Sequence, residues 1–431
     1  MQRILSTELP AHVGATVRLA GWVHRRRLLK SVAFLIVRDA AGLAQVVVAA
    51  PAVREQVEAL TEETVVEVVG TVVAKATAPA GVEVVEPTVR PLGPPAVPPP
   101  FDLYRPVLAA ALPTQLDHAP VALRHPVRSA ALRISAAAVS GFRATLDGRG
   151  FVEVHTPKVV ASSTESGANV FALDWFGRPA YLAQSPQFYK QLMVGVFERV
   201  YEVGPVFRAE PHDTVRHLAQ YTSLDVELGF VADHRDVMAV LRETLAGMVA
   251  TVGERAGGAL ATLGVTVPEV PAEIPAVHFI DALTIAGAPP AEPDLAPAHE
   301  RALGEWALRE HGSDFLFVTG YPMVKRPFYT HPDPARPAYS NGFDLLFRGL
   351  AVTFGEGGFG VVERLSASAD CAELGLCRTS LGREGRVSAP FALQPRTQRS
   401  TDSDRCESGC RAKSAEVTCR GRGGVTHRDR R

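Results

Sequence analysis

The chain has 431 residues, of which 46% are hydrophobic and 21% are charged, and its formal net charge is −1. A chain of this size can bury a large core and is expected to divide into two or three domains. A net charge near zero excludes a protein with positive potential over its whole surface, so any contact with nucleic acid must come from a local patch. No apolar run approaches the roughly 20 residues of a membrane span, and the N-terminus has no signal-peptide core, so we predict a cytoplasmic protein without a membrane partner.

A β-barrel is predicted at the start of the chain. Residues 15–90 alternate hydrophobic and polar positions in short runs separated by Gly, Asp and Pro, a pattern typical of about five strands. Residues 90–106 are rich in proline, which lacks a backbone donor and favours extended geometry, so they are predicted to form a linker. We therefore expect a barrel over residues 1–88, a linker or hinge over 89–128, and a second domain over 129–350.

The second domain is expected to combine helices with a sheet. Hydrophobic residues recur at helical spacing between Ser129 and Leu146, and a glycine turn then leads into strand-like residues 151–157. Residues 199–210 and 221–230 are predicted to pair as strands across a polar, charged segment. Residues 234–312 are rich in Ala, Leu and Glu, which predicts helices over one side of the sheet. Two further strands are expected between residues 315 and 350.

Three segments resemble the class II aminoacyl-tRNA synthetases, in the form of the aspartate-specific branch. They are GFVEVHTPKVV (150–160), QSPQFYKQLMVGVFERVYEVGPVFRAE (184–210) and GWVHRRRLLKSVAFLIVRDAAGLAQVVV (21–48). The resemblance covers about residues 1–350. It implies an α+β fold in which an N-terminal OB-fold barrel binds the anticodon and a catalytic domain has an antiparallel sheet flanked by helices. It also implies a homodimer, because Pro157 of the first segment matches a family residue at the dimer interface.

The resemblance implies an aspartate pocket that contains Lys190. An enzyme that separates aspartate from asparagine needs a fixed cation facing the side-chain carboxylate, and Lys190 matches the family's lysine at that place. The attraction in such a pair is about 4 kcal/mol at 4 Å with an effective dielectric of 20, more than a neutral hydrogen bond supplies. Gln187 is expected to contact the substrate and Glu165 to bind its amino group. The full set implied for aspartate is Glu165, Gln187, Phe188, Tyr189, Lys190 and Arg208.

The resemblance also implies an ATP site, in which Arg208 is the catalytic residue. Activation makes the amino-acid carboxylate attack the α-phosphorus of ATP, and a preorganised guanidinium stabilises the charge that develops on the phosphate oxygens. Arg208 matches the family arginine that holds the α-phosphate and the amino-acid carboxylate, a task suited to its planar fork. The other residues implied for ATP are Ala209, Glu210, Arg216, His217 and Leu218.

In the barrel, the resemblance implies an anticodon-binding face. OB-folds bind single strands by combining a basic groove with exposed aromatic rings on which bases stack. Arg25, Arg26 and Arg27 are expected to contact phosphates and base edges, Phe34 to stack on the central anticodon base, and Gln45 to hydrogen-bond anticodon bases. The alternatives are that Phe34 belongs to the core and that the arginines form a solvated face.

Two barrel positions predict which tRNAs are accepted. In the archaeal-like branch, forms restricted to the aspartate anticodon carry Trp and Lys at two positions, whereas relaxed forms carry His and Pro. His24 and Pro79 match the relaxed form, which predicts an enzyme that aspartylates both tRNA(Asp) and tRNA(Asn). The residues predicted to bind the anticodon are His24, Arg27, Phe34, Gln45 and Pro79.

The C-terminal residues depart from the family pattern. The family uses ATP with Mg²⁺, but Ala351 stands where its metal-binding glutamate belongs, so the metal ligands stay unassigned. Arg364 is a candidate for the third family motif, although it arrives early. All five cysteines lie in the final 61 positions and match no common zinc pattern. Residues 351–431 are predicted to be a divergent tail without a packed core, as a reading-frame change or an internal deletion would produce.

The main functional hypothesis is therefore an aspartate–tRNA ligase, with L-aspartate, ATP and tRNA as partners. A catalytically impaired tRNA-binding paralogue is the alternative, motivated by the missing glutamate. An asparagine synthetase of the same fold is a third possibility, but such enzymes lack an anticodon barrel. Asparaginyl-tRNA synthesis is the nearest enzymatic neighbour, and Lys190 argues against it.

Overall fold

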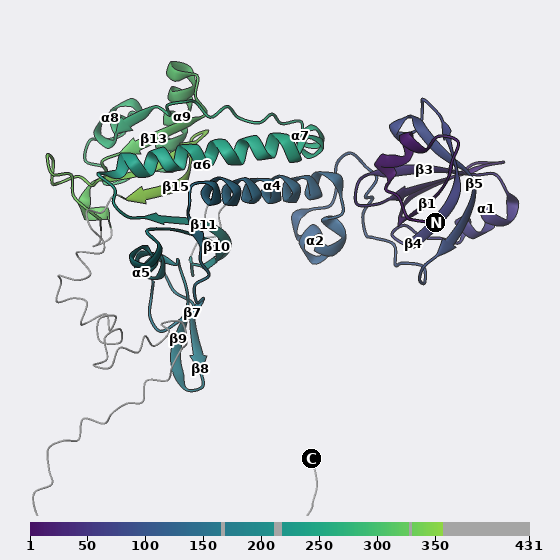
Figure 1. Ribbon diagram of the computed structural model, residues 1–431, viewed down its shortest axis with the longest axis horizontal. Helices are drawn as coiled ribbons and strands as arrows, with labels where there is room; N and C mark the ends of the chain where they lie inside the picture. Colours follow the sequence, from purple (N-terminus) through teal and green to yellow (C-terminus); the bar gives the residue numbers. More distant parts are fainter. Residues whose placement is uncertain (165–168, 211–217, 327–329, 357–431) are drawn as a thin grey trace, which may run out of the picture. The chain divides into compact units, whose positions relative to one another are not determined.

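The computed structural model describes residues 1–164, 169–210, 218–326 and 330–356. Within these residues an N-terminal barrel is followed by short helices and then by a domain of sheets and helices, as Figure 1 shows. The α+β fold predicted from the sequence is confirmed. No helix in the described ranges is long and apolar enough to cross a membrane.

The barrel is closed and has five strands in the order β1-β2-β3-β5-β4. These strands are β1 (Thr16–Leu28), β2 (Ala33–Arg38), β3 (Leu43–Val48), β4 (Val65–Ala74) and β5 (Val82–Pro91). Alternate side chains fill the interior, most of them Val or Leu, as the period of a strand requires. The short helices η1 (Ser6–His12), α1 (Pro51–Glu58) and η2 (Pro79–Gly81) join or precede the strands.

A β-bulge at His24 changes the alternation within β1. Val23 pairs with Val37 and Arg25 with Ile36, so His24 has no partner opposite it on β2. Val23 and His24 are both buried, although they are neighbours in the sequence. The extra residue shifts the phase of the strand, and as a result Arg25 and Arg27 face outward.

Two long helices pack closely in the second domain. They are α4 (Pro126–Gly148) and α6 (His234–Arg255), which run side by side in Figure 1. A Cβ added to Gly141 would lie only 2.7 Å from the Cα of Met248, so only glycine permits this approach. Helix α4 begins three residues before the predicted start, because Pro126 occupies the first turn, where a missing N–H costs nothing. Helices α2 (Leu112–Asp117) and α3 (Ala119–Ala122) precede α4, and α7 (Gly257–Leu263) follows α6.

The central sheet of this domain has the strand order β11-β10-β6. Strands β10 (Arg199–Phe207) and β11 (Gln220–Leu228) are antiparallel, which confirms the predicted pair. Strand β6 (Val152–Glu153) is parallel to β10 and much shorter than predicted for residues 151–157. The reason is a contact with a distant side chain: the backbone N–H of Thr156 donates to the Glu202 carboxylate instead of to a neighbouring strand.

A second sheet has the strand order β12-β13-β14-β15. Its strands are β12 (Ala276–His278), β13 (Phe315–Thr319), β14 (Gly342–Phe347) and β15 (Leu350–Glu356). Helices α8 (Phe279–Ile285) and α9 (Pro297–His311) pack on it around Leu303 and Leu316. Strands β13 and β14 were expected, whereas β12 falls in a region predicted to be helical. Strand β15 continues the sheet beyond residue 350, and residues 357–431 of the predicted tail lie outside the described residues.

A third, small sheet and one helix complete the domain. The sheet consists of β7 (Val159–Val160), β8 (Ala172–Trp175) and β9 (Arg178–Leu182), in the order β7-β9-β8. Helix α5 (Gln187–Phe197) follows β9 and packs Met193 and Val194 against Val200 of β10. The 3₁₀ turn η3 (Met323–Lys325) follows β13.

Candidate active site and nucleic-acid interface

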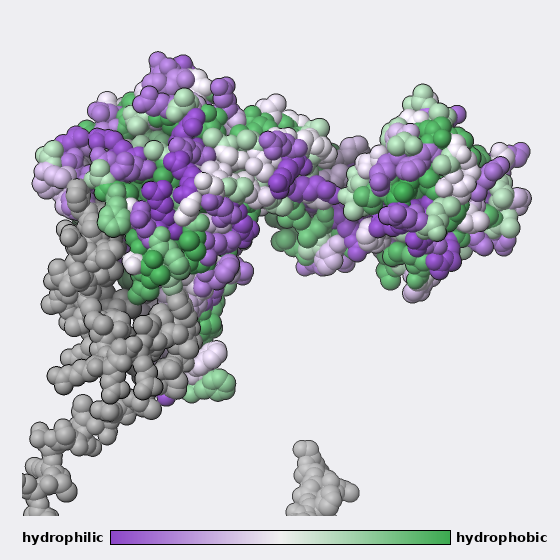
Figure 2. All heavy atoms as spheres, viewed as in Figure 1, coloured by the Kyte–Doolittle hydropathy of each residue, from purple (hydrophilic) through white to green (hydrophobic). Residues whose placement is uncertain are grey.

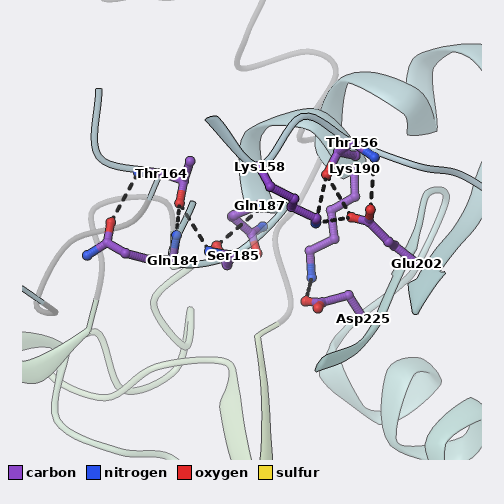
Figure 3. A network of polar contacts seen from close by, with 9 residues as sticks. All are labelled: Thr156, Lys158, Thr164, Gln184, Ser185, Gln187, Lys190, Glu202 and Asp225. Carbon is purple, nitrogen blue, oxygen red and sulfur yellow. Dashed lines mark hydrogen bonds and ion pairs between the residues drawn. The ribbon is translucent and has the colours of Figure 1, made fainter. Parts of the chain in front are cut away.

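Lys190 lies on α5 and reaches across to β11, as Figure 3 shows. Its residue is only 7% exposed, and its Nζ lies 3.0 Å from Oδ1 of Asp225 and 3.5 Å from Oε2 of Glu227. A buried ammonium is stable only beside such partners. Lys190 is therefore not a solvated lysine on an exposed helix face.

Asp225 and Glu227 are site residues that the sequence analysis did not single out. They occupy alternate positions of β11, so both side chains lie on the face that Lys190 approaches. Burial raises the pKa of Glu227, and Lys190 opposes that shift. The signal that could have found them is the pair of acids two residues apart in SLDVELGF, since a half-buried strand rarely carries charge on the side facing the core.

The loop before α5 is fixed by buried hydrogen bonds, also drawn in Figure 3. Oγ1 of Thr164 accepts the backbone N–H groups of Gln184 and Ser185, both at 3.1 Å. Oε1 of Gln184 accepts the N–H of Thr164, and Ser185 Oγ accepts the N–H of Gln187 at the start of the helix. These bonds set where α5 begins and thereby place Lys190.

Two aromatic residues lie between Gln187 and Lys190 on the first turn of α5. Phe188 and Tyr189 are both half-buried, and burial raises the pKa of the Tyr189 hydroxyl. A hydroxyl with a raised pKa stays protonated at neutral pH and can donate a hydrogen bond. Glu165, the remaining member of the predicted aspartate set, lies outside the described residues.

Arg208 follows directly after β10 and continues its pairing with the partner strand. Its backbone N–H donates to the carbonyl of Ala219 at 3.1 Å, and its guanidinium carbon lies 5.8 Å from the ring centre of Tyr221. The side chain is half-buried, as are Ala209 and Glu210. Leu218 is exposed. Arg216 and His217 lie outside the described residues. Of the residues predicted to contact ATP, the structure describes Arg208, Ala209, Glu210 and Leu218.

The outward face of the barrel brings together the predicted RNA-binding residues of β1, β2 and β3. Arg27 pairs with Phe34, and its guanidinium carbon lies 5.6 Å from the centre of that ring. Gln45 pairs with Ile36 on the same face, and its amide donates to Glu83 at 2.9 Å. Phe34 is half-buried and points away from the barrel interior, so the alternative that it belongs to the core is wrong. Hydrophilic and hydrophobic residues are interspersed over the barrel in Figure 2.

Arg26 differs from its two neighbours. It lies between the outward-facing Arg25 and Arg27, and its Nη1 donates to the carbonyl of Glu58 at 2.8 Å. It also lies 3.9 Å from Glu62. A guanidinium that caps the C-terminal end of α1 in this way serves the barrel itself. Arg26 is therefore occupied within the barrel. RNA contacts by Arg25 and Arg27 stay predictions.

The two residues linked to tRNA choice have different environments. Pro79 is exposed in η2, in the connection between β4 and β5. His24 is only 6% exposed, and its Nδ1 lies 3.3 Å from Nη1 of Arg38, which also pairs with Glu63. Burial, followed by the charge of Arg38, lowers the pKa of His24 to about 4. The imidazole is therefore neutral at physiological pH.

A metal site is not visible in the part of the chain that the structure describes. No group of three or more His, Cys, Asp or Glu side chains there could hold an ion. At the position of the family glutamate, the backbone N–H of Ala351 donates to Glu300 at 3.1 Å, and the methyl side chain offers no ligand. Arg364 lies outside the described residues.

Comparisons with known proteins agree with this geometry. Residues 112–359 match the family of class II tRNA synthetases (D, K and N), and residues 17–92 match the OB-fold nucleic acid binding domain. Aspartate–tRNA(Asp/Asn) ligases from Deinococcus radiodurans and Thermus thermophilus are each 44% identical to the chain, with 82% of both partners covered. The crystal structure of asparaginyl-tRNA synthetase from Pyrococcus horikoshii with asparaginyl-adenylate superposes with a TM-score of 0.77 at 28% identity, covering 88% of this chain and 90% of that one. The chain belongs to the class II tRNA synthetases of the D, K and N group.

Proposed function

We propose that the chain is an aspartate–tRNA ligase, which activates L-aspartate with ATP and transfers the aspartyl group to the 3′ end of a tRNA. The observation that carries this proposal is the buried Lys190, whose Nζ lies 3.0 Å from Asp225 and 3.5 Å from Glu227. A free amino acid is a zwitterion. In a pocket with a fixed cation beside two carboxylates, the cation can pair with the side-chain carboxylate of aspartate and the carboxylates can pair with its ammonium group.

The choice of aspartate over asparagine follows from the charge of Lys190. Asparagine has a neutral amide in place of the carboxylate, so it would leave the Lys190 ammonium without a substrate anion. A site built to pair with that carboxylate therefore rejects asparagine strongly. This argument separates the chain from the asparaginyl-tRNA synthetase that it resembles in fold. The two relatives that are 44% identical to the chain are named as aspartate–tRNA(Asp/Asn) ligases, which supports the same choice.

Arg208 is proposed to stabilise the transition state of adenylation. The carboxylate of aspartate attacks the α-phosphorus, the bond to pyrophosphate breaks, and charge accumulates on the non-bridging oxygens. Arg208 is half-buried and its guanidinium lies near the ring of Tyr221, which limits how far it must reorganise when the charge appears. No group of three or more His, Cys, Asp or Glu side chains in the described residues could hold an ion.

The barrel is proposed to bind the anticodon of tRNA(Asp) and also that of tRNA(Asn). The outward pair of Arg27 and Phe34 supplies a cation and a stacking surface, as single-strand binding requires. The strand 2–3 face and the β4–β5 connection, where Pro79 lies, are the regions that OB-folds use for oligonucleotides. A homodimer and a cytoplasmic location remain predictions from the sequence.

The impaired paralogue is the weaker alternative. Its motive was the missing glutamate at Ala351, yet the match to named ligases extends over 82% of the chain and the class II family match runs to residue 359. Pyrophosphate exchange by the full chain distinguishes the two: exchange that depends on aspartate supports the ligase, and its absence supports the paralogue.

Lys190→Met tests the aspartate pocket. We expect aspartate-dependent pyrophosphate exchange to fall at least about 30-fold, since truncating one partner of a buried charge pair costs roughly 2–5 kcal/mol. Binding of tRNA, measured by filter retention, should stay within about twofold. The matched control is Lys30→Met, the same substitution at an exposed barrel lysine. Exchange kinetics equal to those of the control would refute the role of Lys190.

A further inference from the structure

A second lysine lies in a buried polar cluster beside the Lys190 pocket. Glu202 of β10 is only 2% exposed, and its Oε1 accepts the backbone N–H of Thr156 at 2.8 Å. Its Oε2 accepts the Thr156 hydroxyl at 2.7 Å and lies 3.0 Å from Nζ of Lys158. Thr156 and Lys158 thus hold one carboxylate from both sides, as Figure 3 shows.

The cluster leaves little room for movement. A Cβ added to Gly204 would lie 3.3 Å from Lys158 Nζ and 3.3 Å from Glu202 Oε1, so the backbone of β10 packs directly against both groups. Lys158 also donates to the Thr156 hydroxyl at 3.2 Å. The side chain of Lys158 is 20% exposed, whereas that of Glu202 is 3% exposed. The positive charge of Lys158 therefore neutralises the buried carboxylate of Glu202.

The register of the sheet brings this cluster to the edge of the aspartate pocket. Glu202 is the direct partner of Asp225 in the β10–β11 pairing, and Asp225 is the residue that contacts Lys190. Side chains directly opposite each other in an antiparallel pair have Cβ atoms about 4.5–5.5 Å apart, and like charges at such positions repel. Two carboxylates are tolerated there because each has its own lysine.

We propose that Lys158 is a positioning residue for the aspartate subsite: it neutralises Glu202 and so leaves Lys190 to Asp225, Glu227 and the substrate carboxylate. This inference rests on the proposed function. Without Lys158, Glu202 would keep only the donors of Thr156 and would add an uncompensated negative charge next to Asp225. Lys190 would then be the remaining lysine in the network of Figure 3 that could offset this negative charge. The attraction of Lys190 for an incoming substrate carboxylate would fall.

Binding to the full chain tests the proposal without requiring turnover. The probes are the non-hydrolysable 5′-O-(N-aspartyl-sulfamoyl)adenosine and its asparaginyl counterpart, titrated calorimetrically. Lys158→Met should weaken the aspartyl probe roughly tenfold or more and the asparaginyl probe much less, because only the former carries the side-chain charge. Lys158→Met/Glu202→Gln should recover most of the lost affinity, since the unpaired charge is then gone. Lys30→Met, at an exposed lysine, is the matched control.

Three results would overturn the proposal. Equal losses for both probes would make Lys158 merely structural, and a double variant as weak as Lys158→Met would show that Glu202 is not the intermediary. If Lys158→Met does not fold, Glu202→Gln is compared with the double variant, and a loss of about tenfold between these two contradicts the proposal. Failure of the wild-type chain to bind the aspartyl probe is distinguishable from these, because it overturns the proposed function itself.

Discussion

At the scale of single residues, Arg208 is tied to the sheet by its backbone, and its half-buried side chain lies near the ring of Tyr221. Arg208→Ala is expected to lower pyrophosphate exchange by about 10² to 10³, the usual effect of removing one preorganised transition-state donor. The KM for aspartate should rise less than kcat falls, because the charge on the phosphate appears only in the transition state. Steady-state exchange measures both. A variant with normal turnover would show that Arg208 only supports the hairpin.

The sequence was informative about residues that stand in ordered motifs. Lys190 comes three residues after QSPQ and Arg208 lies within FRAE, which is why the sequence predicts both as site residues. The role of Glu202 could not be predicted, because it depends on which strand positions face each other. The register that places Glu202 opposite Asp225 is a property of the β10–β11 pairing, and a pattern of hydrophobic positions does not reveal it.

At the scale of elements, the environment of His24 makes the stability of the barrel depend on pH. The pKa of His24 is lowered from 6.5 to about 4, so the unfolded chain binds a proton that the folded barrel excludes. The contribution of neutral His24 to the free energy of unfolding is fully present above pH 6.5. It is lost as the pH falls toward 4, and the loss is on the order of 3 kcal/mol.

Urea unfolding of the full chain at pH 7 and pH 4.5, with β1 amides followed by hydrogen exchange, measures this loss. His24→Gln should show a smaller decrease between the two pH values than the wild type, since glutamine does not titrate. An identical decrease in both proteins would mean that His24 is not the group responsible. The wild type and His24→Gln must be compared because carboxylates also titrate near pH 4.5 and lower the stability of both proteins. Only the difference between the two proteins reports on His24.

Elements with a long, regular pattern were predictable and short ones were not. The five barrel strands and the β10–β11 pair alternate over many residues, and both were predicted correctly. Strand β12 has three residues, too few for a period to appear, whereas β6 lies within the predicted residues 151–157 but is only two residues long. The end of β6 is fixed by a side chain about fifty residues later, through the bond from Thr156 to Glu202, which no local pattern contains.

At the scale of the whole molecule, the fold alone does not separate aspartate from asparagine enzymes, because the chain superposes on an asparaginyl-tRNA synthetase with a TM-score of 0.77. The tRNA specificity has to come from particular residues. We expect the full chain, if it supports exchange, to aspartylate tRNA(Asp) and tRNA(Asn) transcripts with comparable kcat/KM. Charging of tRNA(Asp) more than about a hundredfold better, roughly 2.7 kcal/mol in discrimination, would refute the relaxed assignment of His24 and Pro79.

The β-bulge at His24 also has a consequence for how this barrel tolerates insertions and deletions. Substitution of His24 leaves the residue count of β1 unchanged, so Arg25 and Arg27 keep their outward direction. Deletion of His24 would remove the extra residue, and every later side chain of the strand would turn over, which sends Arg25 and Arg27 toward the interior and Arg26 outward. The barrel therefore tolerates a change in the identity of this residue but not its removal. A chain lacking His24 should lose tRNA binding more completely than any substitution there, as filter retention would measure.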